Sequence, residues 1–191
     1  SVIGVCINKK FLGFIRAGIN RVSIGVQSFS DKNLLRLGRI HSGKDSILAV
    51  KLAQSAGFSN INIDLMYGLP NQSEEQAMED LIAAVSLKPQ HISWYELTIE
   101  PNTKFYSDPP NLPDENVLEN IHENGLAFLL KNGFSRYEIS AFSSLGRQCE
   151  HNLNYWRFGD YLGIGAGAHS KITRQDGSIT RYSKTRTPED Y

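Results

Sequence analysis

Four polar side chains of the sequence are spaced so that they can bind one polar ligand. Three predicted strands are each followed by a residue with an amide, a carboxylate or a hydroxyl, and an arginine lies twelve residues after the first: Gln27, Asp64, Thr98 and Arg39. The spacings of 37 and 34 residues match successive strand–helix units. Ligands of parallel α/β folds bind at the carboxyl ends of strands, so these groups can contact the hydroxyls and amide-like edges of one cofactor. The alternative is that they are ordinary polar residues that end a strand.

A second group of residues with chemical potential lies within Cys149–Trp156. This segment contains a histidine, an amide and two aromatic rings: His151, Asn152, Tyr155 and Trp156. The imidazole of His151 can be an axial ligand of haem iron, and the rings can flank a flat macrocycle. Arg147 and Arg157 lie on either side and can neutralise carboxylates. The alternative is a capped turn whose tyrosine and tryptophan lie in the core.

Other patterns are interpreted as structural. Gly163–Ala168 matches the loose dinucleotide-binding pattern G-x-G-x-x-A, but a hairpin follows it where a helix is required, so we reject dinucleotide binding. Its glycines instead let a strand pass close to a ligand or to neighbouring backbone. The two cysteines, Cys6 and Cys149, lack the spacing of a zinc site. Three further histidines are expected in a loop, at the start of a strand and on a helix face: His41, His91 and His122.

The elements that position these groups follow a repeated pattern. Three times a helical stretch ends at a glycine, followed by an apolar residue, a polar turn and an alternating strand, at residues 21–26, 60–65 and 136–139. Glycine takes the left-handed helix cap without a Cβ penalty, which permits a short helix–strand connection. A further strand is predicted over residues 91–97. This alternation predicts an α/β domain with a parallel sheet.

The sequence also predicts the starts of two helices and one hairpin. Two serines, each with a polar residue three positions later, predict capping boxes: Ser42 with Asp45 and Ser73 with Gln76. Asp176-Gly177 lies between β-prone residues and predicts a hairpin.

Composition limits the classes of function. The 191 residues correspond to one domain or part of one, and 20 Lys and Arg balance 20 Asp and Glu. This balance argues against non-specific binding to nucleic acid, which needs an excess of basic charge. No apolar run approaches the roughly 18–20 residues that span a bilayer. Because two cysteines far apart in the sequence do not make a disulfide framework, we expect a cytoplasmic protein whose thiols are reduced.

Four segments match a known family: Arg21–Phe29, Arg36–His41, Asn62–Pro70 and Leu97–Thr103. They resemble the radical-SAM group of oxygen-independent coproporphyrinogen III oxidases and their relatives. The block His151–Trp156, followed by Arg157–Tyr161, is similar to the H-N-x-x-Y-W motif of the radical-SAM haem chaperones (HemW), a motif that the true oxidases lack. The resemblance extends from Phe11 to Tyr191.

The resemblance implies a partial (β/α)6 barrel with a carboxyl-side extension. Residues 1–110 would form the carboxyl-terminal half of the barrel, and residues 111–191 the start of the haem-chaperone extension. The barrel would bind S-adenosylmethionine (SAM) beside a [4Fe–4S] cluster, with four residues at the SAM contacts of the family: Gln27, Arg39, Asp64 and Thr98. Haem would be bound at His151, as the ligand of its iron, together with Asn152, Tyr155 and Trp156.

The implied activity is to bind haem and deliver it to acceptors, such as respiratory proteins at the inner membrane face. The resemblance leaves enzymatic activity and a homodimer open, and it favours a non-oxidase chaperone. One alternative is an enzyme that decarboxylates coproporphyrinogen III through a 5′-deoxyadenosyl radical. The other is a non-functional remnant, or a fragment that serves only as a partner surface.

The cluster motif of the family, Cys-x3-Cys-x2-Cys, lies upstream of the first residue of this sequence. Cys6 and Cys149 cannot replace three closely spaced thiolates. We therefore expect the carboxyl-terminal half of a longer protein, or a truncated reading frame. The 191 residues alone would lack the cluster and would leave one edge of the sheet exposed.

Overall fold

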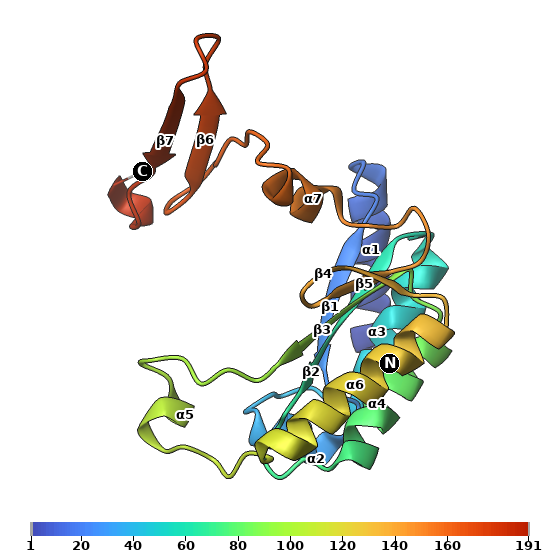
Figure 1. Cartoon of the computed structure of the whole chain (residues 1–191). Helices are drawn as coiled ribbons and strands as arrows, with labels where there is room; N and C mark the ends of the chain where they lie inside the picture. Colours follow the sequence, from blue (N-terminus) through green and yellow to red (C-terminus); the bar gives the residue numbers. More distant parts are fainter. Residues whose placement is uncertain (1, 191) are drawn as a thin grey trace. The chain divides into compact units, whose positions relative to one another are not determined.

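The computed structural model describes the backbone of residues 2–190 and the side chains of residues 9–189, so the side chain of Cys6 lies outside the described residues. The chain divides into two compact units, residues 1–147 and residues 148–191, which we call the sheet unit and the hairpin unit (Figure 1). The sheet unit contains, in order, α1 (Val2–Arg16), β1 (Val22–Gln27), α2 (Asp31–Arg36), α3 (Gly43–Ala56), β2 (Ile61–Tyr67), α4 (Glu74–Ser86), β3 (His91–Glu96), α5 (Lys104–Ser107), α6 (Glu115–Lys131), β4 (Ser135–Glu138) and β5 (Ala141–Ser143). The hairpin unit contains α7 (Glu150–Trp156), β6 (His169–Thr173), β7 (Ile179–Ser183) and a 3₁₀ helix (Pro188–Asp190).

The sheet unit is built on a five-stranded sheet in the order β1-β2-β3-β5-β4. Strands β1, β2 and β3 are parallel, as the sequence predicts. The last predicted strand, β4, does not pair with β3 as the next parallel strand of the sheet. After Glu138 the chain reverses within two residues, and β5 returns antiparallel between β3 and β4. The short β5, which lies directly after β4, was not predicted.

One face of the sheet is apolar and is covered by α3, α4 and α6 (Figure 1). Its strand residues alternate with those of the other face: Val26, Ile63, Leu65, Ile92, Trp94 and Phe142. They pack against apolar residues of the helices, which include Val50, Leu81, Ile121 and Leu129. A Cβ at Gly125 would overlap the ring of Trp94, so glycine lets α6 lie close to the sheet. Because side chains alternate along each strand, burial of the apolar face under the helices directs the intervening side chains to the opposite face.

The predicted helix starts are confirmed. Ser42 with Asp45 begins α3, and Ser73 with Gln76 begins α4, in each case through a complete capping box. The glycine after α3 also behaves as predicted, since Gly57 has φ 104 and caps the helix in the left-handed conformation.

The predicted strand end at Asp64 is wrong. Strand β2 continues to Tyr67, so Asp64 lies in its middle. The strand continues because Leu65 and Tyr67 extend the row of buried side chains on the helix-covered face. Thr98 lies beyond the end of β3 at Glu96, whereas the sequence analysis extended this strand to Leu97.

The hairpin unit is held by polar contacts. Strands β6 and β7 pair antiparallel around Asp176-Gly177, which confirms the predicted hairpin. The buried ammonium of Lys171 lies 3.0 Å from Asp160 Oδ1 and donates to the carbonyl of Phe158 at 2.8 Å. Because β6 follows the glycine-rich segment, no helix opens there. A Cβ at Gly163 would overlap the backbone of His169, which is the close backbone approach that the glycines were expected to allow.

The compact units divide after Arg147, downstream of the boundary that we expected after residue 110. Residues 111–147 belong to the sheet unit because β5 pairs with β3 and α6 buries Ile121 and Leu129 in its core. The expected boundary separates a barrel from an extension by role, and that division stays a prediction.

Candidate functional site

The second face of β1–β3 is polar and is our candidate site. Alternate strand positions supply its side chains, and the register places them next to one another: Ser23, Asn62, Asp64, His91, Ser93 and Tyr95. Successive side chains of a strand point to opposite faces, so the pattern that buries Ile63 and Ile92 under the helices also directs these groups away from them. A parallel sheet with one polar face can bind a polar ligand there.

Asp64 is half-buried and lies between two neighbouring donors. Its Oδ2 accepts a hydrogen bond from Ser23 Oγ at 2.8 Å, and its Oδ1 accepts one from Asn62 Nδ2 at 2.6 Å. Asn62 Nδ2 also donates to Ser23 Oγ at 2.7 Å. The carboxylate is therefore held in place by the strands and keeps lone pairs that can accept from ligand hydroxyls.

Gln27 reaches this face from a bulge at the end of β1. The register shifts between Gly25 and Gln27, and Gln27 has φ 68, a conformation that is uncommon outside glycine. Gln27 is buried, and its Oε1 accepts a hydrogen bond from the hydroxyl of Tyr95 at 2.8 Å. A Cβ on Gly25 would lie 2.9 Å from Gln27 Nε2, so glycine makes room for the amide. With Oε1 engaged, Nε2 is the group that can donate to a ligand.

Tyr95 links three of the predicted residues. Burial raises the pKa of its hydroxyl, and the negative charge of Asp64 acts in the same direction. The hydrogen bond to Gln27 and the positive charge of Arg39 lower it. Arg39 is exposed and follows the turn after α2, where Gly38 has φ 69. The Gln27 amide therefore contacts Tyr95, and the charges of Asp64 and Arg39 act on the same hydroxyl.

Thr98 lies apart from this group, in an adjoining cavity of about 360 Å³. Tyr95 lines both the polar face and this cavity, whose other lining residues are Tyr67, Trp94, Glu96, His122, Ile139 and Ser140. The Tyr67 hydroxyl lies 3.1 Å from His122 Nδ1 and 3.4 Å from Glu96 Oε2. Burial, followed by the charge of Glu96, raises the pKa of Tyr67 to about 12. The structure thus relates Gln27, Arg39 and Asp64 to Tyr95, whereas Thr98 lines a separate cavity that Tyr95 also lines.

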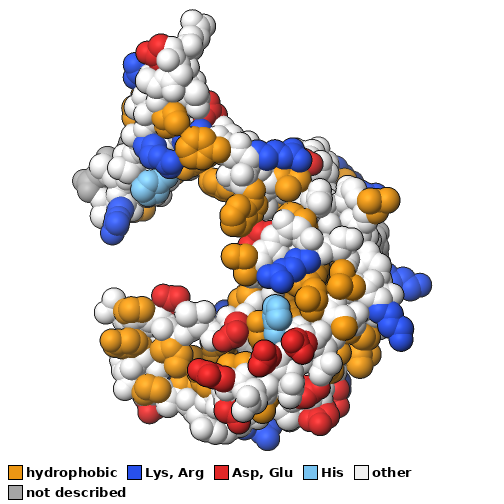
Figure 2. Space-filling model, in the orientation of Figure 1, with side chains coloured by type: hydrophobic (Ala, Val, Ile, Leu, Met, Phe, Trp, Pro, Cys, Tyr) orange, Lys and Arg blue, Asp and Glu red, His pale blue; other side chains and the backbone are white. Residues whose placement is uncertain are grey.

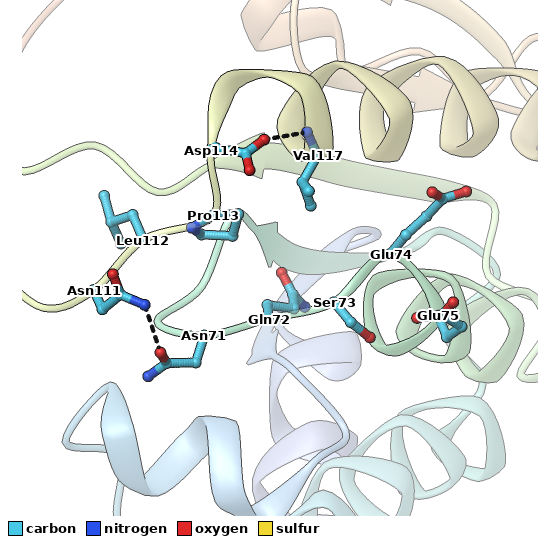
Figure 3. Close-up of a pocket in the computed structure, with 10 residues that line it drawn as sticks. All are labelled: Asn71, Gln72, Ser73, Glu74, Glu75, Asn111, Leu112, Pro113, Asp114 and Val117. Atoms are coloured by element: carbon cyan, nitrogen blue, oxygen red, sulfur yellow. Dashed lines mark hydrogen bonds between the residues drawn. The ribbon is translucent and has the colours of Figure 1, made fainter.

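A larger cavity, of about 680 Å³, lies between the N-termini of α4 and α6 (Figure 3). Asn111 Nδ2 donates to Asn71 Oδ1 at 2.8 Å across it. Figure 2 shows acidic side chains gathered on the lower part of the sheet unit, and Glu74, Glu75 and Asp114 line this cavity. The negative charge of these carboxylates disfavours binding of an anion at the two helix N-termini. We therefore assign the candidate site to the polar sheet face.

The predicted haem residues lie on α7 of the hairpin unit: His151, Asn152, Tyr155 and Trp156. The rings of His151 and Tyr155 meet edge to face with centroids 4.7 Å apart, and the ring centroids of Tyr155 and Tyr161 are 4.9 Å apart. His151, Tyr155 and Trp156 are exposed, whereas Asn152 is half-buried. The alternative of a tyrosine and a tryptophan in the core is therefore wrong. The physical reason is that the two hydrophobic core clusters of the described chain both consist of residues of the sheet unit.

Five polar residues of the sheet face were not predicted as site residues: Ser23, Asn62, His91, Ser93 and Tyr95. Strict alternation was the signal that could have found them, because I-N-I-D in β2 and H-I-S-W-Y in β3 alternate residues of the two faces. His91 does begin β3 as predicted, but both of its ring nitrogens are hydrogen-bonded. His41 lies in a loop and His122 on α6, as predicted.

Among residues 9–189 no group of three or more His, Cys, Asp or Glu side chains is arranged to hold a metal ion. Within the described part of the chain, no helix has the length and apolar character needed to cross a membrane.

Comparison with known sequences gives a consistent result. The profile of the Radical SAM superfamily matches residues 2–83. The heme chaperone HemW of Haemophilus influenzae is 54% identical over 183 residues, and that of Escherichia coli is 55% identical over 182. These matches cover 96% and 95% of this chain and 48% of each relative. The mitochondrial radical S-adenosyl methionine domain-containing protein 1 of Bos taurus is 35% identical, covering 94% of this chain and 42% of its own length.

Comparison with solved structures supports the same fold. Coproporphyrinogen III oxidase (HemN) from Escherichia coli superposes with a TM-score of 0.76 and 24% identity, covering 94% of this chain and 44% of the oxidase. The mixed α/β architecture with its parallel strands is therefore that of a radical-SAM fold. The chain spans about half the length of the curated relatives that it matches.

Proposed function

Since the chain belongs to the HemW family of radical-SAM proteins, we propose that it forms part of a haem chaperone, which binds haem and delivers it to haem-requiring proteins. The observation that carries this proposal is the identity of 54% and 55% to two proteins named heme chaperone HemW. The acceptors that we propose are respiratory proteins at the inner membrane face, and the proposed location of the chaperone is the cytoplasm.

SAM is the proposed ligand of the polar sheet face. Asp64 would accept from ribose hydroxyls, Gln27 Nε2 would donate to an acceptor atom, and Arg39 would pair with the carboxylate of the methionine part. Thr98 would contact the cofactor from the adjoining cavity. The donor set supports this fit, because SAM offers hydroxyl, ring-nitrogen and carboxylate groups within one molecule. The hydrogen bond from Tyr95 to Gln27, and the charges of Asp64 and Arg39 that act on the Tyr95 hydroxyl, also support it.

The cysteines of this chain do not fit a [4Fe–4S] cluster. A cluster that keeps one iron open to SAM needs three thiolates, whereas this sequence has Cys6 and Cys149 alone. We therefore propose that the cluster ligands come from outside these 191 residues.

Haem is the proposed ligand of α7. His151 would be the axial ligand of its iron, and Asn152, Tyr155 and Trp156 would contact the porphyrin. The exposure of the imidazole and of both aromatic rings supports this assignment, because a large flat ligand needs an accessible surface.

Two substitutions in the full-length protein test the proposal. His151→Ala should weaken haem binding about tenfold or more and leave SAM affinity unchanged, since the two ligands are assigned to different units. Asp64→Ala should weaken SAM binding and leave haem affinity unchanged. Haem is followed by the Soret band in a titration, and SAM by isothermal titration calorimetry. His169→Ala changes another exposed histidine of the hairpin unit and is the matched control for haem.

Each outcome distinguishes a different error. Unchanged haem affinity in His151→Ala would refute the axial ligand. Loss of both ligands in one variant would indicate misfolding and would contradict two separate sites. Turnover of coproporphyrinogen without haem binding would favour an oxidase instead. That alternative is not favoured, because the oxidase HemN resembles this chain at 24% identity and so shares its fold alone.

A further inference from the structure

A chain of hydrogen bonds leads to Asp64 across three strands of the sheet. The hydroxyl of Tyr137 lies 2.6 Å from His91 Nε2, and His91 Nδ1 lies 2.6 Å from Asn62 Oδ1. Asn62 Nδ2 then donates to Asp64 Oδ1 at 2.6 Å. His91 and Asn62 are 0% and 2% exposed, and they are register partners on β3 and β2. The imidazole is therefore a fixed neighbour of the amide that contacts the carboxylate.

The direction of each hydrogen bond follows from the chemistry of the groups. A carboxylate only accepts, so the NH₂ of Asn62 faces Asp64 and its oxygen faces His91. His91 Nδ1 must then carry the proton that it donates to Asn62. Burial, followed by the positive charge of Arg21, lowers the pKa of His91 to about 4, so the ring is neutral at pH 7. Its Nε2 therefore accepts from the hydroxyl of Tyr137.

We infer that His91 is a positioning residue for Asp64, because its Nδ1–H fixes the orientation of the Asn62 amide and so presents an N–H to the carboxylate. Without this donor, Asn62 can turn its oxygen toward Asp64, and two acceptors then face each other. Ser93 Oγ also donates to Asn62 Oδ1, at 3.2 Å, but from a half-buried position and over a longer distance. The inference rests on the proposed role of Asp64 in SAM binding.

Two variants of His91 separate positioning from bulk. Glutamine can donate to Asn62 and accept from Tyr137, so His91→Gln should keep SAM affinity within about threefold of wild type. Leucine can do neither, so His91→Leu should weaken SAM binding about tenfold or more. Ile92→Ala is the matched control, because Ile92 is the next residue, is 0% exposed and points to the opposite face. It should lower the melting temperature and leave SAM affinity within about twofold.

These measurements use the full-length protein, with calorimetric SAM titration and thermal unfolding for each variant. Weakened affinity in His91→Leu, retained in His91→Gln and Ile92→Ala, supports the inference. Equal losses in His91→Leu and Ile92→Ala would show a merely structural role and overturn it. If Asp64→Ala weakens SAM binding and His91→Leu does not, the inference is wrong and the proposed function stands. If neither variant weakens it, the assignment of Asp64 to SAM fails as well.

A direct measurement covers the case in which His91→Leu does not fold. Long-range ¹H–¹⁵N spectra of the wild-type protein report which imidazole nitrogen carries the proton. We expect a neutral His91 protonated at Nδ1 at pH 7. A proton at Nε2 would reverse the direction of the hydrogen bonds and overturn the inference.

Discussion

The two sets of predicted ligand-binding residues lie in regions of opposite character. On the sheet face, Asp64 and Gln27 are held by hydrogen bonds from Ser23, Asn62 and Tyr95. On α7, by contrast, His151 meets the ring of Tyr155 edge to face, and Tyr155 and Trp156 are 47% and 62% exposed. One region is organised before a ligand arrives, and the other offers an accessible surface.

The contrast indicates how each region would bind its ligand. Side chains that are already fixed lose little conformational freedom on binding, which favours selectivity for a ligand of one shape. An exposed short helix has little stability of its own and depends on its surroundings for order. We therefore expect selectivity on the sheet face and ready release at α7, which suits a cofactor in one place and a cargo in the other.

The largest expected effect contrasts two phenylalanines. Phe142 is 0% exposed in the core of the sheet unit. Phe142→Ala should therefore lower the free energy of unfolding by about 3–5 kcal/mol. Phe158 is 58% exposed, with the Lys171 ammonium 4.1 Å from its ring centroid, so Phe158→Ala should cost about 1 kcal/mol. Denaturant unfolding followed by fluorescence checks both. Trp94 reports on the sheet unit and Trp156 on the hairpin unit, and equal costs would contradict the contrast.

A smaller effect is the pH dependence of each unit. In the sheet unit, burial raises the pKa of Asp80 to about 6, although Ser28 Oγ and the Phe29 amide donate to it. A raised carboxyl pKa stabilises the fold below its ordinary value of 3.8, and this contribution is lost as pH rises through about 6. The loss is on the order of 2–3 kcal/mol. Asp80→Asn should remove this dependence between pH 4 and pH 7.

The hairpin unit should respond in the opposite sense. Hydrogen bonds, first from the amide of Thr173 and then from Lys171, lower the pKa of Asp160 to about 2. A lowered carboxyl pKa contributes stability above 3.8, and that contribution is lost as pH falls through about 2. Unfolding curves of wild type, Asp80→Asn and Asp160→Asn across pH test both signs. A hairpin unit that gains stability on acidification would contradict the prediction.

The smallest expected effect concerns Tyr95. Tyr95→Phe removes the hydroxyl that donates to Gln27 Oε1, and the amide is then free to rotate. We expect SAM affinity to fall about fivefold, with haem affinity unchanged. Calorimetric titration measures the change. Tyr161→Phe removes a hydroxyl from the hairpin unit and is the control; equal effects of the two variants on SAM would show that the sheet face does not orient Gln27.

Much of the fold could be predicted because it depends on local chemistry. Ser42 and Ser73 cap their helices, Gly57 ends one, and Asp176-Gly177 turns the hairpin, each through contacts within a few residues. The reversal at β4 and β5 could not be predicted in this way. The pairing of Ala141 with Ser93 is a long-range contact, and a three-residue strand carries little sequence signal.

The candidate site was predicted in part for a similar reason. Gln27 and Asp64 were chosen as residues near strand ends, and Arg39 was chosen because it follows Gln27 by twelve residues. What relates all three in the structure is Tyr95 of a third strand, which donates to Gln27 and whose hydroxyl feels the charges of Asp64 and Arg39. Asp64 was placed at a strand end although β2 continues past it, because polarity alone does not distinguish an end from an uncovered face. Their roles as ligands of SAM stay predictions.

Gln27 also ends an edge strand, since β1 pairs with β2 on one side and is the first strand in the sheet order. A strand added against β1 would complete its ladder up to the bulge and restrict the unusual backbone of Gln27. A small molecule that forms a hydrogen bond with the Gln27 side-chain amide would restrict the same backbone. The two events would then reinforce each other by equal factors, because thermodynamic linkage is reciprocal. Ligand binding to the polar face would then strengthen the pairing of an added strand with β1, and that pairing would strengthen ligand binding.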